Sequence, residues 1–225
     1  MPPTLYIVAT PIGNLEDITM RALRVLKECD AILCEDTRVT RKLLTHYGIE
    51  TSTISYHEYS GPAKYEKVRA LLLEGKTLAL VTDAGTPGIS DPGAQLVEHV
   101  RSTLPAVRIE SVPGPSALVA AFSVSGIVST SFHFYGFPPH KKGRKTFFEQ
   151  VAKSECAVAF YESPHRLVKA LESLTTVLPA VRKVYVCREL TKLHEEVVSG
   201  SAAEVHMHFL QHPDTVRGEC VILVA

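Results

Sequence analysis

The sequence has no excess of either charge, because 24 lysine and arginine residues balance 24 aspartate and glutamate residues. A global basic field that would attract nucleic acid is therefore absent, and any RNA contact must come from local clusters. No apolar run reaches the ~18 residues that span a bilayer. The first residues also lack the basic segment of a signal peptide. These absences predict a globular protein without a membrane span or a secretory leader.

Paired cysteines are lacking as well. No two of the five cysteines form a CxxC pair, and four of them lie in strand-like apolar runs. Cysteine in such a run usually serves as a small buried hydrophobic residue. This usage predicts free thiols and a cytoplasmic protein. The five residues are Cys29, Cys34, Cys156, Cys187 and Cys220.

Several familiar catalytic fingerprints are missing. The chain contains no GxGxxG, no GxxxxGK[ST] and no GxSxG motif, which disfavours a dinucleotide site, a P-loop hydrolase and a nucleophile elbow. His206, His208 and His212 have no cysteine or carboxylate arranged around them. A polar helix face is therefore expected there, with a metal site as the less favoured alternative. No internal repeat or low-complexity segment is present.

What is present in the first half is an alternation of β-prone and helical patterns. Such alternation predicts an α/β domain with a mostly parallel sheet. Strands are expected at residues 4–10, 31–34, 52–56, 77–82 and 107–112. Helices are expected after Asp17 or Thr19, at residues 39–47, around Tyr65 to Leu72, and at residues 94–104.

Residues 113–117, Pro-Gly-Pro-Ser-Ala, predict a boundary between two α/β domains, residues 1–114 and 115–225. The second half should continue with helices and strands, and its last strand reaches the chain terminus, which suggests a truncated chain. Helices are expected at residues 118–124, from Thr146, at 167–177 and at 202–211. Strand-like segments are expected at residues 131–137, 157–161, 184–187, 195–199 and 221–224.

The stretch that organises the first half is residues 81–93, VTDAGTPGISDPG. It follows a buried strand and precedes a helix, which is how open α/β sheets build ligand sites. Gly85, Gly88 and Gly93 should let the backbone approach a ligand, while Pro87 and Pro92 should stiffen the loop. Asp83 could bind a ligand's amine or hydroxyls, or it could pin the loop itself.

Three other loops carry functional groups. Residues 35–38, Glu-Asp-Thr-Arg, could supply a base and a cation, or could form a solvated turn that caps the next helix. Residues 162–166, Glu-Ser-Pro-His-Arg, place an acid, an imidazole and a guanidinium at a strand end. The basic loop at residues 138–145 could bind phosphates or could face solvent. Loops at the carboxyl ends of neighbouring strands converge, so these groups could share one cleft.

Taken together, these motifs resemble a known family. The chain is similar to the tetrapyrrole methylase-like (class III) S-adenosylmethionine methyltransferases, and among them to the members that methylate small-subunit ribosomal RNA. The similarity extends over essentially the whole chain. It is carried by residues 9–19, 35–38, 81–93, 113–117, 160–166 and 188–192.

The resemblance implies two α/β domains with S-adenosylmethionine in the cleft between them, and a homodimer. It also implies methylation of the 2′-hydroxyl of a cytidine in the decoding centre of 16S rRNA. Many relatives have GDP in the cofactor loop, whereas this chain has Gly85-Thr86-Pro87, so the aspartate's role does not carry over to Thr86. A small domain that follows the last strand in relatives is expected to be absent from this chain.

The resemblance and the loop chemistry together nominate site residues. Candidate catalytic residues are Glu35, Asp36, Arg38, Glu162, His165 and Arg166. Candidate cofactor-binding residues are Pro11, Gly13, Asp83, Gly85, Thr86, Pro87, Ser90, Ser116, Ala117 and Tyr161. Candidate RNA-binding residues are Lys141, Lys142, Arg144 and Lys145, and no metal ligand is nominated.

Two alternatives stay open at this point. One keeps the fold and changes the substrate to a tetrapyrrole or another small molecule. The other is a non-catalytic S-adenosylmethionine-binding protein that assists ribosome assembly. The basic loop and residues 162–166 argue against the small-molecule alternative.

Overall fold

The computed structural model describes residues 2–57, 60–91 and 93–225. The chain divides into two compact units, Met1–Ser116 and Ala117–Ala225. Each unit has its own sheet and its own hydrophobic core. None of the helices in the described residues combines the length and the apolar composition that crossing a bilayer requires.

The sheet of unit 1 has the strand order β3-β2-β4-β1-β5, and every neighbouring pair is parallel. All described residues of the central strands β2 and β4 are buried, as expected for a parallel sheet with helices on both faces. The prediction of a parallel α/β sheet is confirmed for this half. The strands are β1 (Thr4–Val8), β2 (Ala31–Cys34), β3 (Thr53–Ser55), β4 (Leu78–Leu80) and β5 (Arg108–Val112).

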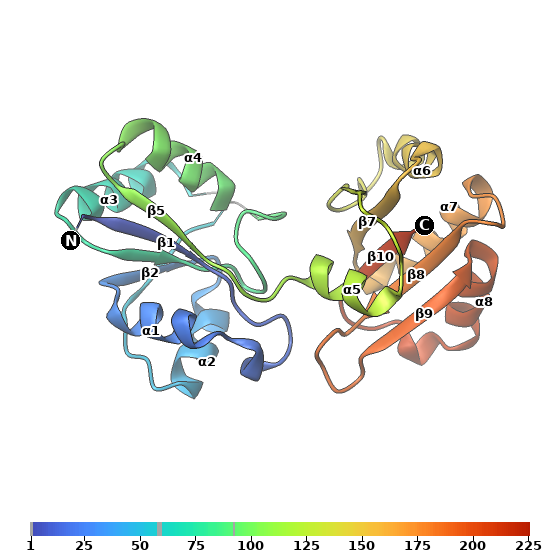
Figure 1. Cartoon of the computed structure of the whole chain (residues 1–225), viewed down its shortest axis with the longest axis horizontal. Helices are drawn as coiled ribbons and strands as arrows, with labels where there is room; N and C mark the ends of the chain where they lie inside the picture. The colour runs from blue at the N-terminus through green and yellow to red at the C-terminus, as the bar shows by residue number, and fades with distance from the viewer. Residues whose placement is uncertain (1, 58–59, 92) are drawn as a thin grey trace. The chain divides into compact units, whose positions relative to one another are not determined.

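Helices cover both faces of this sheet (Figure 1). Helices α1 (Met20–Glu28) and α2 (Thr37–His46) share one core cluster, while α3 (Pro62–Leu73) and α4 (Gly93–Thr103) share the cluster on the opposite face. A short 3₁₀ helix, η1 (Leu15–Asp17), precedes α1. Thr19 caps α1 and Asp36 caps α2, because each side chain accepts a backbone N–H of the first turn.

The connections that follow the neighbouring strands β1 and β4 go to opposite faces of the sheet. The segment after β1 leads to α1 on one face, and the segment after β4 leads to α4 on the other. Divergence of two such connections opens a crevice beyond the carboxyl ends of the strands, where α/β sheets usually bind ligands.

Unit 2 is built on a mixed sheet with the strand order β6-β7-β10-β8-β9. Only the β6–β7 pairing is parallel among the described strands, and the other three pairings are antiparallel. The parallel arrangement predicted for the first half does not extend to this half, because β10 and β9 run antiparallel to the strands beside them. The strands are β6 (Phe132–Phe134), β7 (Ala157–Glu162), β8 (Lys183–Arg188), β9 (Glu196–Ser201) and β10 (Cys220–Val224).

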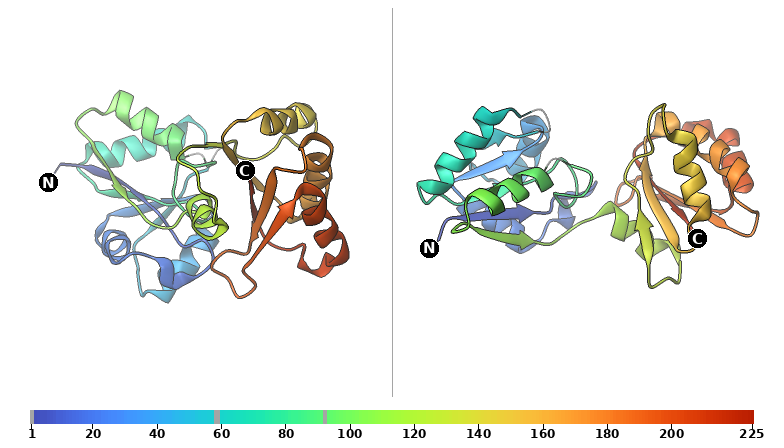
Figure 2. Two further views of the ribbon diagram at one scale, coloured as in Figure 1. Left: turned by 45° about the vertical axis from the view of Figure 1, so that its right-hand side comes forward. Right: turned by 90° about the horizontal axis from the view of Figure 1, so that it is seen from above.

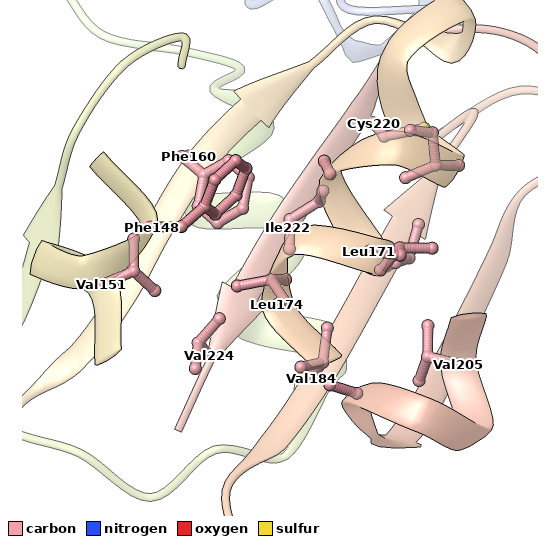
Figure 3. Close-up of a cluster of buried hydrophobic side chains, with 14 of the residues drawn as sticks. Phe148, Val151, Phe160, Leu171, Leu174, Val184, Val205, Cys220, Ile222 and Val224 are labelled. Atoms are coloured by element: carbon pink, nitrogen blue, oxygen red, sulfur yellow. The ribbon is translucent and has the colours of Figure 1, made fainter. Parts of the chain in front are cut away.

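The helices of unit 2 lie on both faces of its sheet (Figure 2). Helix α5 (Ala117–Ser125) contacts β8 and β10 on one face. Helices α6 (Arg144–Lys153), α7 (Pro164–Val177) and α8 (Ala202–Gln211) supply the core cluster on the other face, and a short 3₁₀ helix, η2 (Pro213–Thr215), follows α8. In that cluster, Phe148 of α6 and Phe160 of β7 lie against the apolar side chains of α7 and β10 (Figure 3).

Several helices begin earlier than the sequence pattern predicts, and in α6 and α7 the change affects the candidate residues of the second half. Helix α6 begins at Arg144 rather than Thr146. Helix α7 begins at Pro164 rather than Leu167, because proline is well suited to the first position of a helix. Residues 164–166 are therefore the first turn of α7 and not part of a loop.

The cysteine prediction is confirmed at four positions. Cys29, Cys34, Cys187 and Cys220 are buried free thiols, whereas Cys156 is half-exposed. Cys29 lies outside the strands, as the C-terminal cap of α1.

Candidate functional site

The loops that follow β1 and β4 are joined by backbone hydrogen bonds. The N–H of Thr10 donates to the carbonyl of Gly85 at 2.9 Å, and the N–H of Gly85 donates to the carbonyl of Thr10 at 3.0 Å. The Thr10 hydroxyl also donates to the carbonyl of Thr82 at 3.1 Å. Two loops that are distant in sequence therefore form one frame at the carboxyl edge of the unit 1 sheet.

Asp91 holds the Gly/Pro loop in shape. Its carboxylate accepts backbone N–H groups from Gly88, Ile89 and Gly93, and the last of these residues begins α4. Ser90 lies between these donors with a φ of 61°, a left-handed conformation that is uncommon for a residue with a side chain. The predicted stiffening by Pro92 lies outside the described residues.

Asp83 pins the neighbouring loop and not its own. Its Oδ1 accepts the backbone N–H of Asp36 at 3.1 Å, which ties the end of β4 to the start of α2. The Asp36 carboxylate in turn accepts the backbone N–H and the guanidinium of Arg38. The side-chain hydrogen bond from Arg38 lowers the pKa of Asp36 to about 2. Asp83 itself is exposed, so it can still face a ligand.

Thr86 connects the loop to the last segment of unit 1. Its hydroxyl donates to the carbonyl of Pro115 at 3.0 Å. Gly85, directly before it, has a φ of 83°, which glycine adopts far more readily than other residues. Pro87, directly after it, is buried. The triplet therefore ties the Gly/Pro loop to Thr10 through Gly85 and to Pro115 through Thr86.

A cavity of about 250 Å³ opens inside this frame. Its wall combines the loop after β1, the loop after β4 and one side of α2. Three predicted residues, Pro11, Gly13 and Asp83, line it, and so do Val39 and Lys42, which the sequence did not single out. The volume is slightly below the ~300 Å³ at which small-molecule sites usually begin, so one compact group fits.

The second set of predicted residues belongs to unit 2, at the end of β7. The Glu162 carboxylate is fully buried and is bound by two guanidinium groups, Arg144 at 2.9 Å and Arg166 at 2.8 Å. Its Oε1 also accepts the backbone N–H of Ser163. The Nη1 atom of Arg166 is buried and has no hydrogen-bond partner within the described residues. The side chain of His165, directly before Arg166 in the sequence, is exposed.

The basic loop presents its lysines and turns its arginine inward. Lys141, Lys142 and Lys145 are exposed. Arg144 donates to Glu162 and to the carbonyl of Pro139, and its guanidinium lies 5.2 Å from the centre of the Phe148 ring. Arg144 therefore fixes the base of the loop, while the lysines face solvent.

The remaining candidate residues lie at separate places and do not form a cluster. Tyr161 is half-buried against Phe134 and Phe137, and burial raises the pKa of its hydroxyl. Ser116 and Ala117 are half-buried at the boundary between the units. Glu35 and Ser90 are exposed at the edge of the unit 1 sheet. Within the described residues, no group of three histidine, cysteine, aspartate or glutamate side chains could hold a metal ion.

Sequence reasoning missed Asp91, Thr10 and Lys42. An aspartate two residues before a helical pattern is a recognisable N-terminal signal, so Asp91 could have been found. The Thr10–Gly85 bridge joins residues 75 positions apart and leaves no local signal. In the sequence Lys42 is one of several charges on a polar helix face, and only the structure shows that it lines the cavity.

Comparisons with known proteins give consistent results. The profile of the family described as tetrapyrrole (corrin/porphyrin) methylases matches residues 4–206. A ribosomal RNA small subunit methyltransferase I from Halalkalibacterium halodurans is 45% identical over 98% of this chain and 75% of its own length. Proteins of the same description are 45% identical in Vibrio cholerae, over 99% of this chain and 77% of theirs, and 44% identical in Thermotoga maritima, over 91% of each.

Solved structures share the fold at low sequence identity. A cobalt precorrin-4 methyltransferase of cobalamin biosynthesis superposes with a TM-score of 0.70 at 20% identity, covering 99% of this chain and 94% of that one. The uroporphyrin-III-C-methyltransferase from Thermus thermophilus gives 0.68 at 18% identity, with the same coverage. Such distant similarity supports the two-sheet α/β architecture and says nothing of the substrate.

Proposed function

This chain belongs to the tetrapyrrole (corrin/porphyrin) methylase family, and within it to the ribosomal RNA small subunit methyltransferases I; from this membership we propose that it methylates the 2′-hydroxyl of a cytidine in 16S rRNA, with S-adenosylmethionine as methyl donor. The observation that carries the proposal is an identity of 45% over nearly the whole chain. The much lower identity to the precorrin and uroporphyrin methyltransferases supports only a common fold.

The residues at the edge of the unit 1 sheet fit the cofactor. The exposed carboxylate of Asp83 suits the amine of its amino-acid part, and the cavity wall beside Pro11 and Gly13 is mostly apolar. Among the described residues, none has an atom within 4 Å of the position that a Cβ on Gly88 would take, so a ligand can approach the backbone there. Gly85, Thr86, Pro87 and Ser90 would shape the loop, and Ser116, Ala117 and Tyr161 are proposed as further contacts.

When bound, S-adenosylmethionine supplies a methyl group on a sulfonium, so the protein's main task is alignment of the accepting oxygen. The 2′-oxygen gains the methyl, the sulfur keeps the electron pair of the broken bond, and the hydroxyl proton must go to a base. Glu35 and His165 are the favoured candidates, because both are exposed. Arg38, Arg166 and Lys145 are candidates for stabilising the developing negative charge.

Two of the nominated carboxylates are less suited to accept that proton. Both oxygens of Glu162 are occupied by Arg144, Arg166 and Ser163, and the side chain has no exposed surface. Asp36 has a pKa of about 2, far from the working pH at which a general base is most effective. These contacts favour positioning roles for both residues.

The lysines of the basic loop are proposed to contact RNA phosphates. Lys141 and Lys142 are exposed on a loop whose base is fixed by Arg144, and Lys145 is exposed in the first turn of α6. A fixed base lowers the conformational entropy lost when the loop binds. Neutralising the three lysines should weaken RNA binding and reduce its dependence on salt.

The resemblance also implies a protein partner, a second copy of this chain in a homodimer. Val119 and Val124 are exposed on α5, and apolar side chains of this kind are commonly covered when copies of a chain associate. Sedimentation analysis at several concentrations would test this, and a monomer at every concentration would contradict it.

The deciding experiment measures transfer of labelled methyl from S-adenosylmethionine to small ribosomal subunits, with nucleoside mass analysis of the product. A porphyrinoid in a parallel reaction tests the small-molecule alternative, and cofactor binding without turnover on either acceptor would indicate the non-catalytic alternative. Gly85→Val and Pro87→Ala test the loop by cofactor titration. Unchanged affinity in both variants would remove the loop from the cofactor site.

A further inference from the structure

Helix α2 has an exposed face with an unusual charge pattern. Its sequence, TRVTRKLLTH, contains Arg38, Arg41 and Lys42 and no acidic residue. All three cations are exposed, whereas Leu43 and Leu44 pack into the core. The chain as a whole has no net charge, so this acid-free helix is a local positive patch on a neutral protein.

These cations repel one another on a helix that has no acid to offset them. Arg38 is three residues from Arg41 and four from Lys42, the spacings at which side chains on a helix are neighbours and like charges destabilise it. Arg38 is partly offset by Asp36, but no carboxylate in the described residues forms an ion pair with Arg41 or Lys42. A helix that keeps such a cluster forgoes stability that an acidic residue would give.

Several cations on other helices have an acidic partner on their own helix. Arg24 of α1 pairs with Glu28, and Arg69 of α3 pairs with Glu66. Even Lys145 on α6 has Glu149 within 3.9 Å. Among the described helices that carry lysine or arginine, α2 differs in having no acidic residue at all, although single cations without an ion pair, such as Lys67 of α3, also occur on other helices.

The position of α2 connects this face to the candidate site. The helix begins directly after β2, at the same edge of the sheet as the loops after β1 and β4. Lys42 and Val39 form part of the cavity wall together with Thr10 and Asp83. The cationic face therefore lies at the rim of the cavity and covers about 6 Å of the helix, from Arg38 to Lys42 at 1.5 Å per residue.

We propose that Arg41 and Lys42 form a second phosphate-binding surface, which holds the RNA backbone next to the nucleotide that is methylated. The inference rests on the proposed function and adds a contact on unit 1 to the basic loop of unit 2. Polyanionic RNA is the partner that an acid-free cationic face fits best, because binding releases condensed counterions. A site at the cavity rim would position the target strand, while the contact itself would carry no sequence information.

The test compares the double variant Arg41→Gln/Lys42→Gln with Lys67→Gln/Arg69→Gln. Lys67 and Arg69 are exposed on α3, which lies on the opposite face of the same sheet, so both variants lose the same charge from the same unit. Affinity for small ribosomal subunits is measured between about 50 mM and 200 mM salt. Thermal unfolding checks that both variants fold.

Loss of two phosphate contacts should reduce the slope of log affinity against log salt by about 1.5. The loss of affinity between the two salt concentrations should then become about eightfold smaller than in the wild-type protein. The α3 variant should keep the wild-type slope. Equal slopes in the α2 variant and the wild-type protein would overturn the inference, and so would equal losses in the two variants.

Failure of the proposed function would appear differently. In that case the wild-type protein itself would bind or methylate small subunits no better than a porphyrinoid acceptor. If wild-type methylation is normal and the α2 variant has an unchanged slope, only the second surface is wrong.

Discussion

The guanidinium of Arg144 binds the buried carboxylate of Glu162, with 2.9 Å between Nη2 and Oε2. Glu162 has no exposed surface, so its charge depends on Arg144 and Arg166 for compensation. Glu162, the last residue of β7, is therefore important for stability, and its ion pair with Arg144 attaches the basic loop to β7.

Removing the carboxylate of Glu162 should therefore lower the free energy of unfolding substantially. Glu162→Ala leaves two mostly buried arginines without a counter-charge, and breaking a buried pair in this way typically costs about 3–5 kcal/mol. The free energy of unfolding in urea measures the loss. Glu28→Ala, which removes the exposed pair with Arg24, should change it by less than about 1 kcal/mol. Equal effects of the two substitutions would contradict a supporting role for Glu162.

Asp91 should matter for cofactor binding through the shape of its loop. Asp91→Ala removes the acceptor of three backbone N–H groups, and each such hydrogen bond typically contributes about 0.5–1.5 kcal/mol. We expect weaker S-adenosylmethionine binding by calorimetry. Ser201→Ala removes the cap of α8 in unit 2 at a similar cost in stability. If both variants bind the cofactor like the wild-type protein, Asp91 has no role at the site.

The hydroxyl of Thr86, and not its methyl group, should contribute to stability and to cofactor binding. Thr86→Val keeps the volume but loses the hydrogen bond to Pro115, and leaving that carbonyl without its donor should cost about 1 kcal/mol or more. Thr86→Ser keeps the hydroxyl and should stay close to the wild-type protein. Thermal unfolding and cofactor titration of the pair separate the two effects. Similar losses in both variants would show that the methyl group, not the hydrogen bond, is important.

Local sequence patterns predicted most elements of this fold because the strands and helices of unit 1 follow simple periodicities. Helix α8 was placed at its observed bounds, since Ser201 and Glu204 form a capping box there. The antiparallel insertion of β10 was not predicted, because pairing between strands distant in sequence leaves no local signal.

The candidate residues were found by type, but their contacts could not be read from the sequence. For Asp83 the sequence allows a ligand contact or a hydrogen bond within its own loop, whereas the structure shows a hydrogen bond from the backbone N–H of Asp36 on the neighbouring loop. The same holds for Arg144, which reads as one more cation in a basic run until its partner Glu162 is seen 18 positions away. Such tertiary contacts decide which member of a cluster faces the solvent.

Asp36 gives a prediction that depends on pH. The hydrogen bonds from Arg38 hold its pKa at about 2 in the folded protein, while a free aspartate titrates near 3.9, about two units higher. A lowered pKa means that the contact stabilises the fold above about pH 4 and that this contribution is lost as the pH falls toward 2. A carboxyl NMR titration should show the low value in the wild-type protein. Arg38→Met should raise it toward the ordinary value, whereas Arg41→Met, which removes a charge but no hydrogen bond to Asp36, should not.

The thiols should react in an order set by burial. Burial raises the pKa of Cys29, Cys187 and Cys220 to about 12, so almost no thiolate is present at pH 8. Burial also raises the pKa of Cys34. In the folded protein a thiol-specific reagent should therefore label Cys156 first, because it is the half-exposed thiol. Peptide mass mapping at pH 8, with and without denaturant, measures the order. Fast labelling of Cys187, whose sulfur lies against the carbonyl of Ala121 on α5, would mean that α5 leaves the sheet in solution.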